Sequence, residues 1–314
     1  MSISNEYSFS RYLAAKKSVD DRALNKHVLQ SLVNALKERN DGMTLQILEI
    51  GAGIGTMLER LMGWGILNYA CYEAIDLNPD HINEARRLIP IWSCAQGFEL
   101  TESCDSELCL GRKTENISVR FESIDLYEFI AREQGKRRWD LLIAHAFMDL
   151  IDASRVLPGL ISMMNPGGLL YLTMNYDGVT ILEPPIDLTY DEQVFTFYND
   201  SMDKRLVNGL PSGDSHIGRH LFARFQEHNI QILAAGSSDW VVYPGVDAYP
   251  LDEAYFLHFI INLIDTTLKG HPSLQPDRFN QWITARHSQI EQNKLFFIAH
   301  QIDFLGRMDE LPAQ

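Results

Sequence analysis

The amino-acid sequence predicts an α/β protein with a doubly wound parallel sheet and helices on both faces. The apolar run 45–50 leads directly into three glycines at alternate positions, Gly51, Gly53 and Gly55, and a helix is expected from Thr56. Four more strand-and-helix units follow, with strands expected at 68–77, 117–123, 139–144 and 169–174. Regular alternation of strands and helices is typical of a parallel sheet that is covered on both sides.

Length and composition limit the classes of function. The 314 residues suit one domain, 1–314, and the net charge of −15 argues against a nucleic-acid partner and an anionic membrane surface. No apolar run is long enough for a membrane span, and the N-terminus lacks a signal peptide pattern, so a cytoplasmic location is expected. The four cysteines lack metal-ligand spacing, which predicts reduced thiols and no metal site; they are Cys71, Cys94, Cys104 and Cys109.

The glycine turn is suited to binding a ligand close to the backbone. Missing side chains allow close approach, and the following helix start offers unpaired N–H groups. A dinucleotide site needs G-x-G-x-x-G, whereas here the third glycine comes one residue early. Glu49, two residues before the first glycine, is a poor neighbour for pyrophosphate. It favours a ligand that carries positive charge and hydroxyl groups.

The run Glu49-x-Gly51-x-Gly53-x-Gly55 resembles the first motif of class I S-adenosylmethionine (SAM) methyltransferases. Asp76, Asp125 and the turn 165–168, Asn-Pro-Gly-Gly, follow in the family's order, and the resemblance covers the chain from about residue 45 onward. It implies a Rossmann-like methyltransferase fold with a seven-stranded, mostly parallel sheet. The last strand, 295–304, is expected to be antiparallel. It also implies in-line methyl transfer from SAM to a small-molecule acceptor with an O-, N- or C-nucleophile, which releases S-adenosyl-L-homocysteine.

The resemblance also implies roles for individual residues. Glu49 would face the methionine end of SAM, Asp76 the ribose hydroxyls and Asp125 the adenine amine. Asp76 and Asp125 also have an alternative role as helix caps, with Asn78 competing for the first position. The predicted cofactor-binding residues are Arg11, Tyr12, Glu49, Gly51, Ala52, Gly53, Gly55, Asp76, Leu77, Ile124, Asp125, Leu126, His145 and Ala146.

A general base is useful if the acceptor is a hydroxyl or an amine. The candidate bases are His145, Asp149, Asp177 and His216, of which His145, Asp149 and His216 are the predicted catalytic residues. The alternative for each is a structural hydrogen bond or a solvated loop charge. An acceptor that is already nucleophilic needs no base.

Three segments lie outside the regular strand-and-helix units. Residues 1–40 are expected to form an arm and a helix, capped by Ser18 and running to Arg39, that cover the cofactor site. In the arm, Arg11 is predicted to bind the carboxylate of SAM, because a guanidinium holds a carboxylate with two hydrogen bonds. Residues 91–116 are expected to be an irregular surface excursion, and 175–215 a long lid or substrate loop after the fifth strand.

Residues 251–268 are apolar on almost every side, which predicts a deeply buried helix or a subunit interface such as a homodimer. The second possibility keeps open an alternative function, a catalytically silent SAM-binding or interaction protein. A nicotinamide-dependent oxidoreductase is the other alternative. The early third glycine and the Pro-Gly-Gly turn disfavour it.

Overall fold

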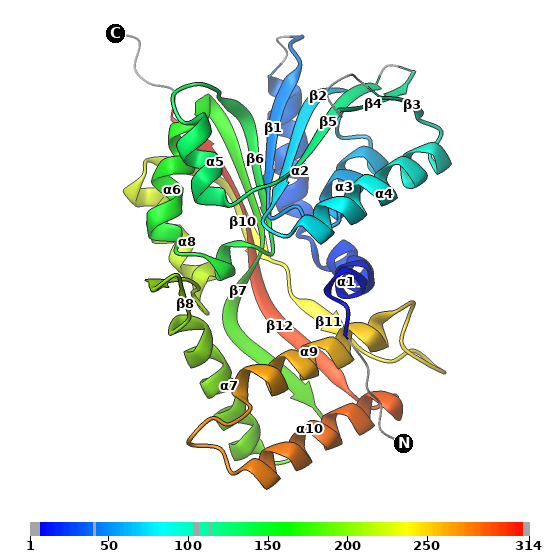
Figure 1. Cartoon of the computed structure of the whole chain (residues 1–314), viewed down its shortest axis with the longest axis vertical. Coiled ribbons are helices and arrows are strands. Elements are labelled where there is room, and N and C mark those ends of the chain that lie inside the picture. The colour runs from blue at the N-terminus through cyan, green and yellow to red at the C-terminus, as the bar shows by residue number, and fades with distance from the viewer. Residues whose placement is uncertain (1–6, 40–41, 103–106, 114, 310–314) are drawn as a thin grey trace.

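The computed structural model describes residues 7–39, 42–102, 107–113 and 115–309, and a mixed sheet lies at its centre (Figure 1). Five strands are parallel: β1 (Leu45–Ile50), β2 (Tyr69–Asp76), β5 (Glu115–Ser123), β6 (Trp139–His145) and β7 (Met164–Glu183). Their order in the sheet is β5-β2-β1-β6-β7. The chain therefore winds outward in both directions from β1, as the sequence predicts.

The last strand is antiparallel, as expected. β12 (Phe296–Met308) lies between β7 and β10 (Ile230–Ser237) and runs antiparallel to both. The expected count of seven is too low, because the sheet has ten strands within the described residues. The three additional strands are β3 (Glu99–Glu102), β4 (Leu108–Arg112) and β11 (Trp240–Val242), of which β11 pairs with β12.

The prediction of an irregular excursion over residues 91–116 is wrong for the described part of that range. α4 (Pro79–Ala95) continues into it, and β3 and β4 then form an antiparallel pair at the edge of the sheet. Leu108 and Leu110 are buried and lie opposite Val119 and Ile117 of β5. Alternating apolar side chains on two neighbouring strands stabilise this pairing.

Helices cover both faces of the sheet. On one face, α2 (Lys26–Glu38), α3 (Thr56–Gly63) and α4 share a core with β1, β2 and β5. On the other, α5 (Leu126–Glu133), α6 (Ala153–Ser162) and α8 (Ile217–Glu227) pack against β6 and β7. The doubly wound arrangement is confirmed.

The N-terminal segment forms two helices, so the predicted arm followed by one helix from Ser18 is wrong. α1 (Phe9–Ala23) is capped by Ser8, which accepts a hydrogen bond from the Arg11 N–H. Asn25 caps α2 and accepts from the backbone N–H groups of residues 27 and 28. Ser18 lies inside α1 and donates to Glu253. Serine followed by acidic residues fits a helix start, but α1 begins earlier, after Ser8, and a second helix starts after the break at residue 24.

The second part of the molecule is built on β7 and β12, which extend past the sheet as a paired ribbon (Figure 1). α7 (Leu188–Asp203), α9 (Glu253–Leu268) and α10 (Pro276–Glu291) pack there with the aromatic side of α1. The expectation of a long loop at 175–215 is therefore wrong. The segment holds the end of β7, then α7, then the short pair β8 (Leu206–Val207) and β9 (Leu210–Pro211).

The apolar helix α9 is covered within its own chain. Phe256, Leu257, Ile261 and Ile264 are buried among side chains of α1, α7 and α10. Of the two possibilities that the sequence left open, deep burial is the observed one. The homodimer was predicted because an apolar helix at 251–268 could have been exposed, and its burial within the chain removes that reason. None of the described helices is both long and apolar enough to span a bilayer.

Candidate functional site

The glycine turn joins β1 to α3 in a conformation that suits glycine. Gly51, Gly53 and Gly55 all have positive φ, at 65°, 55° and 84°. A Cβ on Gly51 would collide with the ring of Phe147, and one on Gly53 would lie 3.1 Å from Leu13 of α1. Side chains from two other elements therefore approach the turn closely. Larger residues at these positions would be strained and crowded.

Asp76 lies at the end of β2, directly beside this turn. Its Oδ2 accepts a hydrogen bond of 2.8 Å from the Gly53 N–H, and its Oδ1 accepts one of 2.8 Å from the Asn78 N–H. His81 Nδ1 lies 3.2 Å from the same Oδ1. Asn78 caps α4, so the alternative that Asp76 is the helix cap is wrong. The carboxylate instead fixes the glycine turn against β2.

Glu49 is a buried carboxyl group beneath the turn. The Tyr72 hydroxyl donates a 2.7 Å hydrogen bond to its Oε2. Burial raises the pKa of Glu49 to about 8, with a further contribution from the charge of Asp76, against the opposing effects of Tyr72 and Arg60. The side chain is therefore largely protonated at neutral pH. A cation placed here would favour its ionised form.

Asp125 follows β5 and caps α5. Its Oδ1 accepts hydrogen bonds from the N–H groups of Tyr127 and Glu128, at 2.8 and 3.2 Å, which is the capping role left open by the sequence. The Ile124 N–H donates to the Asp76 carbonyl oxygen, so the ends of β2 and β5 are joined. Contact of Asp125 with adenine stays a prediction, as do the roles of the neighbouring residues Leu77, Ile124 and Leu126.

His145 ends β6 in a buried polar network. Its Nδ1 lies 2.8 Å from Thr173 Oγ1, and its Nε2 lies 3.0 Å from Asp20 Oδ2. Burial lowers the pKa of His145 to about 4 in spite of the nearby Asp20 carboxylate. Both ring nitrogens are engaged, which fits a structural role better than that of a general base. Ala146 follows with a positive φ of 50° and donates to the Thr173 carbonyl.

Asp20 of α1 is the centre of this network, and sequence reasoning missed it. Its carboxylate accepts from Lys16 Nζ at 2.8 Å, Trp240 Nε1 at 2.8 Å and Arg60 at 3.3 Å, besides His145. Burial acts to raise the pKa of Asp20, but the surrounding cations outweigh it and hold the pKa well below its usual range. The i,i+4 spacing of Lys16 and Asp20 was the available signal.

The two cofactor candidates on α1 have different surroundings. Arg11 binds both oxygens of Asp252, at 3.0 Å each, and its guanidinium lies over the ring of Tyr255. Tyr12 is buried and stacks on Phe259 with a centroid distance of 4.1 Å. The guanidinium of Arg11 is thus already paired with a carboxylate in this structure. Binding of the SAM carboxylate by Arg11 stays a prediction.

The remaining acid and base candidates differ sharply in their partners. Asp177 accepts two hydrogen bonds of 2.8 Å from Arg219, and His216 Nδ1 lies 2.8 Å from Ser215 Oγ. Both have structural partners. Asp149 lies in the short helix η1 (Met148–Leu150), and its buried Oδ1 has no hydrogen-bond partner. Burial raises the pKa of Asp149 to about 6, so it is the candidate with an oxygen still available.

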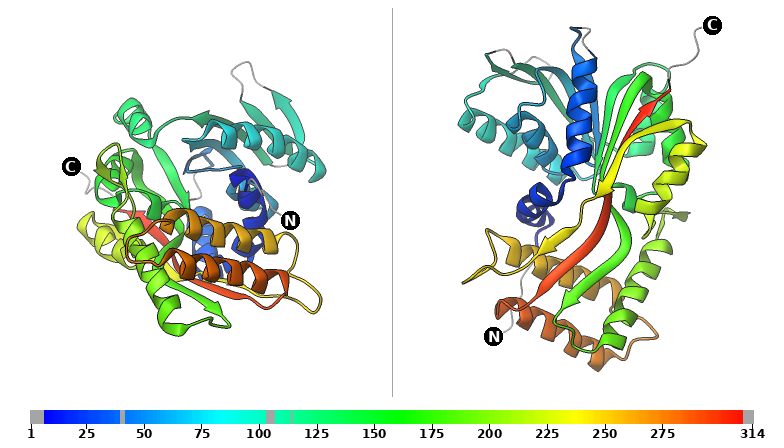
Figure 2. Two further views of the ribbon diagram at one scale, coloured as in Figure 1. Left: turned by 60° about the horizontal axis from the view of Figure 1, so that its bottom comes forward. Right: turned by 180° about the vertical axis from the view of Figure 1, so that it is seen from behind.

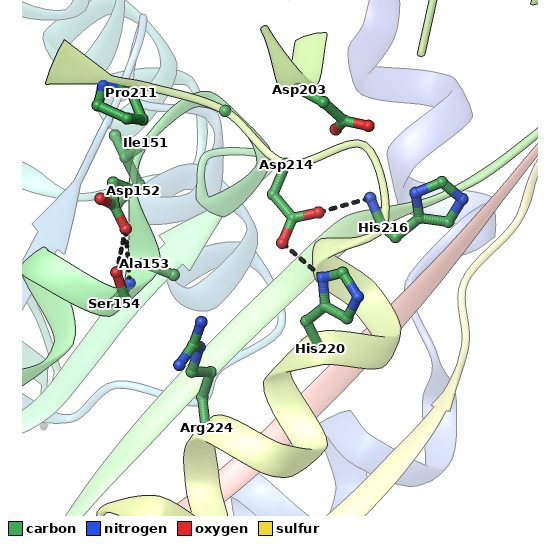
Figure 3. Close-up of a pocket in the computed structure, with 11 residues that line it drawn as sticks. Ile151, Asp152, Ala153, Ser154, Asp203, Pro211, Asp214, His216, His220 and Arg224 are labelled. Atoms are coloured by element: carbon green, nitrogen blue, oxygen red, sulfur yellow. Dashed lines mark hydrogen bonds and ion pairs between the residues drawn. The ribbon is translucent and has the colours of Figure 1, made fainter. Parts of the chain in front are cut away.

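A cavity of about 380 Å³ is lined by the start of α6, by residues between the end of α7 and α8, and by α8 itself (Figure 3). His216 lines it, together with Asp203 and Asp214, and one ligand atom from each of the three lies within 4.8 Å of the others. Asp203 accepts from the Ser215 N–H, and Asp214 accepts from the His216 N–H and from His220 Nδ1. Both carboxylates thus have hydrogen-bond partners within the protein, and we assign no metal ion to Asp203, Asp214 and His216.

Sequence comparison finds no relative of this chain, whereas structure comparison finds similar proteins. No protein-family model matches the sequence, and no curated protein does. Among solved structures, the chain is similar to a SAM-dependent methyltransferase from Thiobacillus denitrificans in complex with S-adenosyl-L-homocysteine. The identity is 13%, the coverage 94% of this chain and 97% of that one, and the TM-score 0.42. The YcgJ protein from Bacillus subtilis matches at 13% identity, with 90% and 99% coverage and a TM-score of 0.44.

A putative sarcosine dimethylglycine methyltransferase from Galdieria sulphuraria matches at 12% identity, with 96% and 85% coverage and a TM-score of 0.38. All three matches have TM-scores below 0.5 and identities of 12–13%. Similarity at this level assigns neither a family nor an activity to the chain.

Proposed function

We propose that this protein is an enzyme that transfers a methyl group from SAM to a small-molecule acceptor. One observation carries the proposal: two carboxyl groups meet a glycine turn at the carboxyl edge of the parallel sheet. Glu49 lies under the turn, and Asp76 is bound to it through the Gly53 N–H at 2.8 Å. In open α/β sheets this edge is where ligands bind.

The chemistry of these groups fits SAM. Asp76 has a side chain that is 12% exposed, and each of its oxygens can accept more than one hydrogen bond, which suits ribose hydroxyls. The buried Glu49 carboxyl suits a cationic neighbour, which would lower its pKa again. A pyrophosphate would instead meet the carboxylate of Asp76 and would keep the buried Glu49 protonated. The pair therefore favours SAM over a nicotinamide dinucleotide.

The protein's own contribution would be alignment and exclusion of water. When bound, SAM supplies an electron-poor methyl group on a sulfonium. Leu13 of α1 lies against Gly53, and Phe147 lies against Gly51, so apolar side chains close the site from two directions. Figure 2 shows α1 between the sheet and the α9–α10 part of the molecule. An enclosed site of this kind holds the acceptor in line and keeps water out.

Calorimetry with S-adenosyl-L-homocysteine, SAM and NADH tests the cofactor. We expect the first two to bind and NADH not to bind. Binding of NADH without S-adenosyl-L-homocysteine would contradict the proposal and favour the oxidoreductase. A screen of acceptors with methyl-labelled SAM then tests turnover. Binding without transfer to any acceptor would favour the catalytically silent alternative.

A further inference from the structure

His81 of α4 is a buried histidine that lies against the carboxylate of Asp76. Its side chain belongs to a residue that is 8% exposed. Its Nδ1 lies 3.2 Å from Asp76 Oδ1, and its Nε2 lies 3.2 Å from the side-chain nitrogen of Asn78. Both ring nitrogens therefore have a partner at the junction of β2 and α4. The imidazole is held at two edges, directly beside the end of β2.

The cap of α4 decides which nitrogen of His81 carries the proton. The side-chain oxygen of Asn78 accepts a 2.9 Å hydrogen bond from the Asp80 N–H. The amide nitrogen of Asn78 therefore faces His81, and this nitrogen can only donate. Because Nε2 of His81 must accept this hydrogen bond, the ring proton lies on Nδ1. His81 thus donates its Nδ1–H to Asp76 Oδ1.

An aromatic ring from α1 covers the face of this imidazole. Phe9 stacks on His81 with a centroid distance of 5.2 Å and an interplanar angle of 22°. Phe9 also packs edge-on against Tyr12 and Phe259, with centroid distances of 5.4 and 5.6 Å. His81 is therefore fixed on one face as well as at its two edges. A side chain held in this way is suited to orienting a neighbouring functional group.

The carboxylate of Asp76 is left with one vacant acceptor position. A carboxylate has about four lone-pair positions, shared equally between its oxygens. Among the described residues, Oδ1 accepts from the Asn78 N–H at 2.8 Å and from His81, so both of its positions are used. Oδ2 accepts from the Gly53 N–H at 2.8 Å, which leaves one position on that oxygen. Two of the donors are backbone groups, and His81 is the side chain that completes the set.

We infer that His81 is a positioning residue that restricts Asp76 to one of the two ribose hydroxyls of SAM. This inference rests on the proposed methyl-transfer function. By occupying the second position on Oδ1, the Nδ1–H of His81 leaves Oδ2 to receive a hydroxyl and keeps the carboxylate from turning toward both. The other ribose hydroxyl is then bound by neither oxygen of Asp76. The result is a cofactor site that distinguishes the 2′-hydroxyl from the 3′-hydroxyl.

Two analogues of S-adenosyl-L-homocysteine, the 2′-deoxy and the 3′-deoxy compound, test this inference by calorimetry. In the wild-type protein we expect one analogue to bind about tenfold more weakly than the other, because it alone loses a hydrogen bond to a charged acceptor. A ligand that bound Asp76 through both hydroxyls would lose similar affinity in both analogues. Equal affinities for the two analogues would therefore overturn the inference.

Variants of His81 separate positioning from a merely structural role. His81→Ala removes the donor and opens the second position on Oδ1, so the two affinities should approach each other to within about twofold. His81→Asn keeps an N–H donor close to the place of Nδ1 and should preserve their ratio. A structural histidine would affect both analogues alike, so an unchanged ratio in His81→Ala would contradict the inference, as would its loss in His81→Asn.

His27→Ala is the matched control for these variants. His27 is an exposed histidine in the first turn of α2, which also begins after an asparagine cap, Asn25. It lies on a different helix from the one that follows β2. The ratio of the two affinities should therefore stay at its wild-type value.

Nuclear magnetic resonance tests the hydrogen bond in the wild-type protein itself. A long-range proton–nitrogen spectrum should show His81 with its proton on Nδ1, and the absence of this signal in His81→Asn assigns it. A proton on Nε2 would overturn the inference, because Nδ1 could not then donate to Asp76. Failure of the proposed function would give a different result: the wild-type protein would not bind S-adenosyl-L-homocysteine, and the proton would still lie on Nδ1.

Discussion

The carboxylate of Asp20 lies 3.0 Å from Nε2 of His145, across 125 residues of sequence. This contact joins the N-terminal helix α1 to the carboxyl end of β6. The same carboxylate holds Arg60 of α3 and Trp240 of β11. One acidic side chain thus connects four elements around the proposed cofactor site. We therefore expect it to anchor α1 at the glycine turn, where Leu13 lies against Gly53.

Replacement of Asp20 should therefore destabilise the protein strongly. Asp20→Asn keeps the shape but leaves Lys16 and Arg60 buried without their shared counter-charge. Breaking a buried ion pair from one side typically costs about 3–5 kcal/mol. Urea unfolding measures the loss.

Asp21→Asn is the matched control for this experiment. Asp21 also pairs with Arg60, but its side chain is 39% exposed. We expect a smaller loss than for Asp20→Asn, because Asp21 is partly exposed to water and Arg60 keeps Asp20 as a counter-charge. Similar losses in the two variants would mean that the network around Asp20 is not the anchor of α1.

The raised pKa of Glu49 predicts that SAM binding releases protons. In the free protein the pKa is about 8, so the group is mostly protonated at pH 7. A nearby cation lowers this pKa, and the proton leaves as SAM binds. The binding enthalpy at pH 7 should depend on the ionisation enthalpy of the buffer. Glu49→Gln should abolish that dependence, whereas an unchanged slope would exclude Glu49 as the source.

The same group predicts a pH dependence of stability without ligand. The folded-state pKa of Glu49 lies above its unfolded value of 4.5. Its stabilising contribution is full below the unfolded pKa and is lost as pH rises through about 8. Relative to Glu49→Gln, the wild-type protein should become less stable between pH 5 and 8. Parallel stability curves for the two proteins would contradict this assignment.

The glycine turn permits a test that separates backbone strain from ligand contact. Gly53→Val should abolish binding of S-adenosyl-L-homocysteine, because the side chain crowds Leu13 and the turn in a residue with φ of 55°. Gly65→Val is the control: its φ of 65° is similarly unfavourable, but a Cβ there meets nothing within 4 Å. We expect both variants to lose stability and only Gly53→Val to lose binding. Retained binding in folded Gly53→Val would place the ligand elsewhere.

Local patterns were sufficient to predict the parallel strands and the glycine turn. Each of these strands carries its own apolar run, and each glycine of the turn has a positive φ, which favours a residue without a side chain. The extension of β7 past residue 174 could not be predicted in this way, because it depends on pairing with β12, where Ile298 lies opposite Ile181. Asp20 was missed for the same reason: three of its four partners lie on other elements. The orphan oxygen of Asp149 likewise appears only once the chain is folded.

Asp76 should contribute both to the cofactor site and to the stability of the turn. Asp76→Ala removes an acceptor for the proposed ribose hydroxyls, each charged hydrogen bond being worth about 1.5–3 kcal/mol. It also leaves the Gly53 and Asn78 N–H groups without the partners they have at 2.8 Å. Loss of these two hydrogen bonds should also lower the stability of the protein. We expect weaker binding of S-adenosyl-L-homocysteine by calorimetry and a lower free energy of unfolding in urea. Asp80→Ala is the control, because Asp80 is an exposed first-turn residue of the following helix. If Asp76→Ala lost stability but kept its affinity, the carboxylate would be a structural clamp alone.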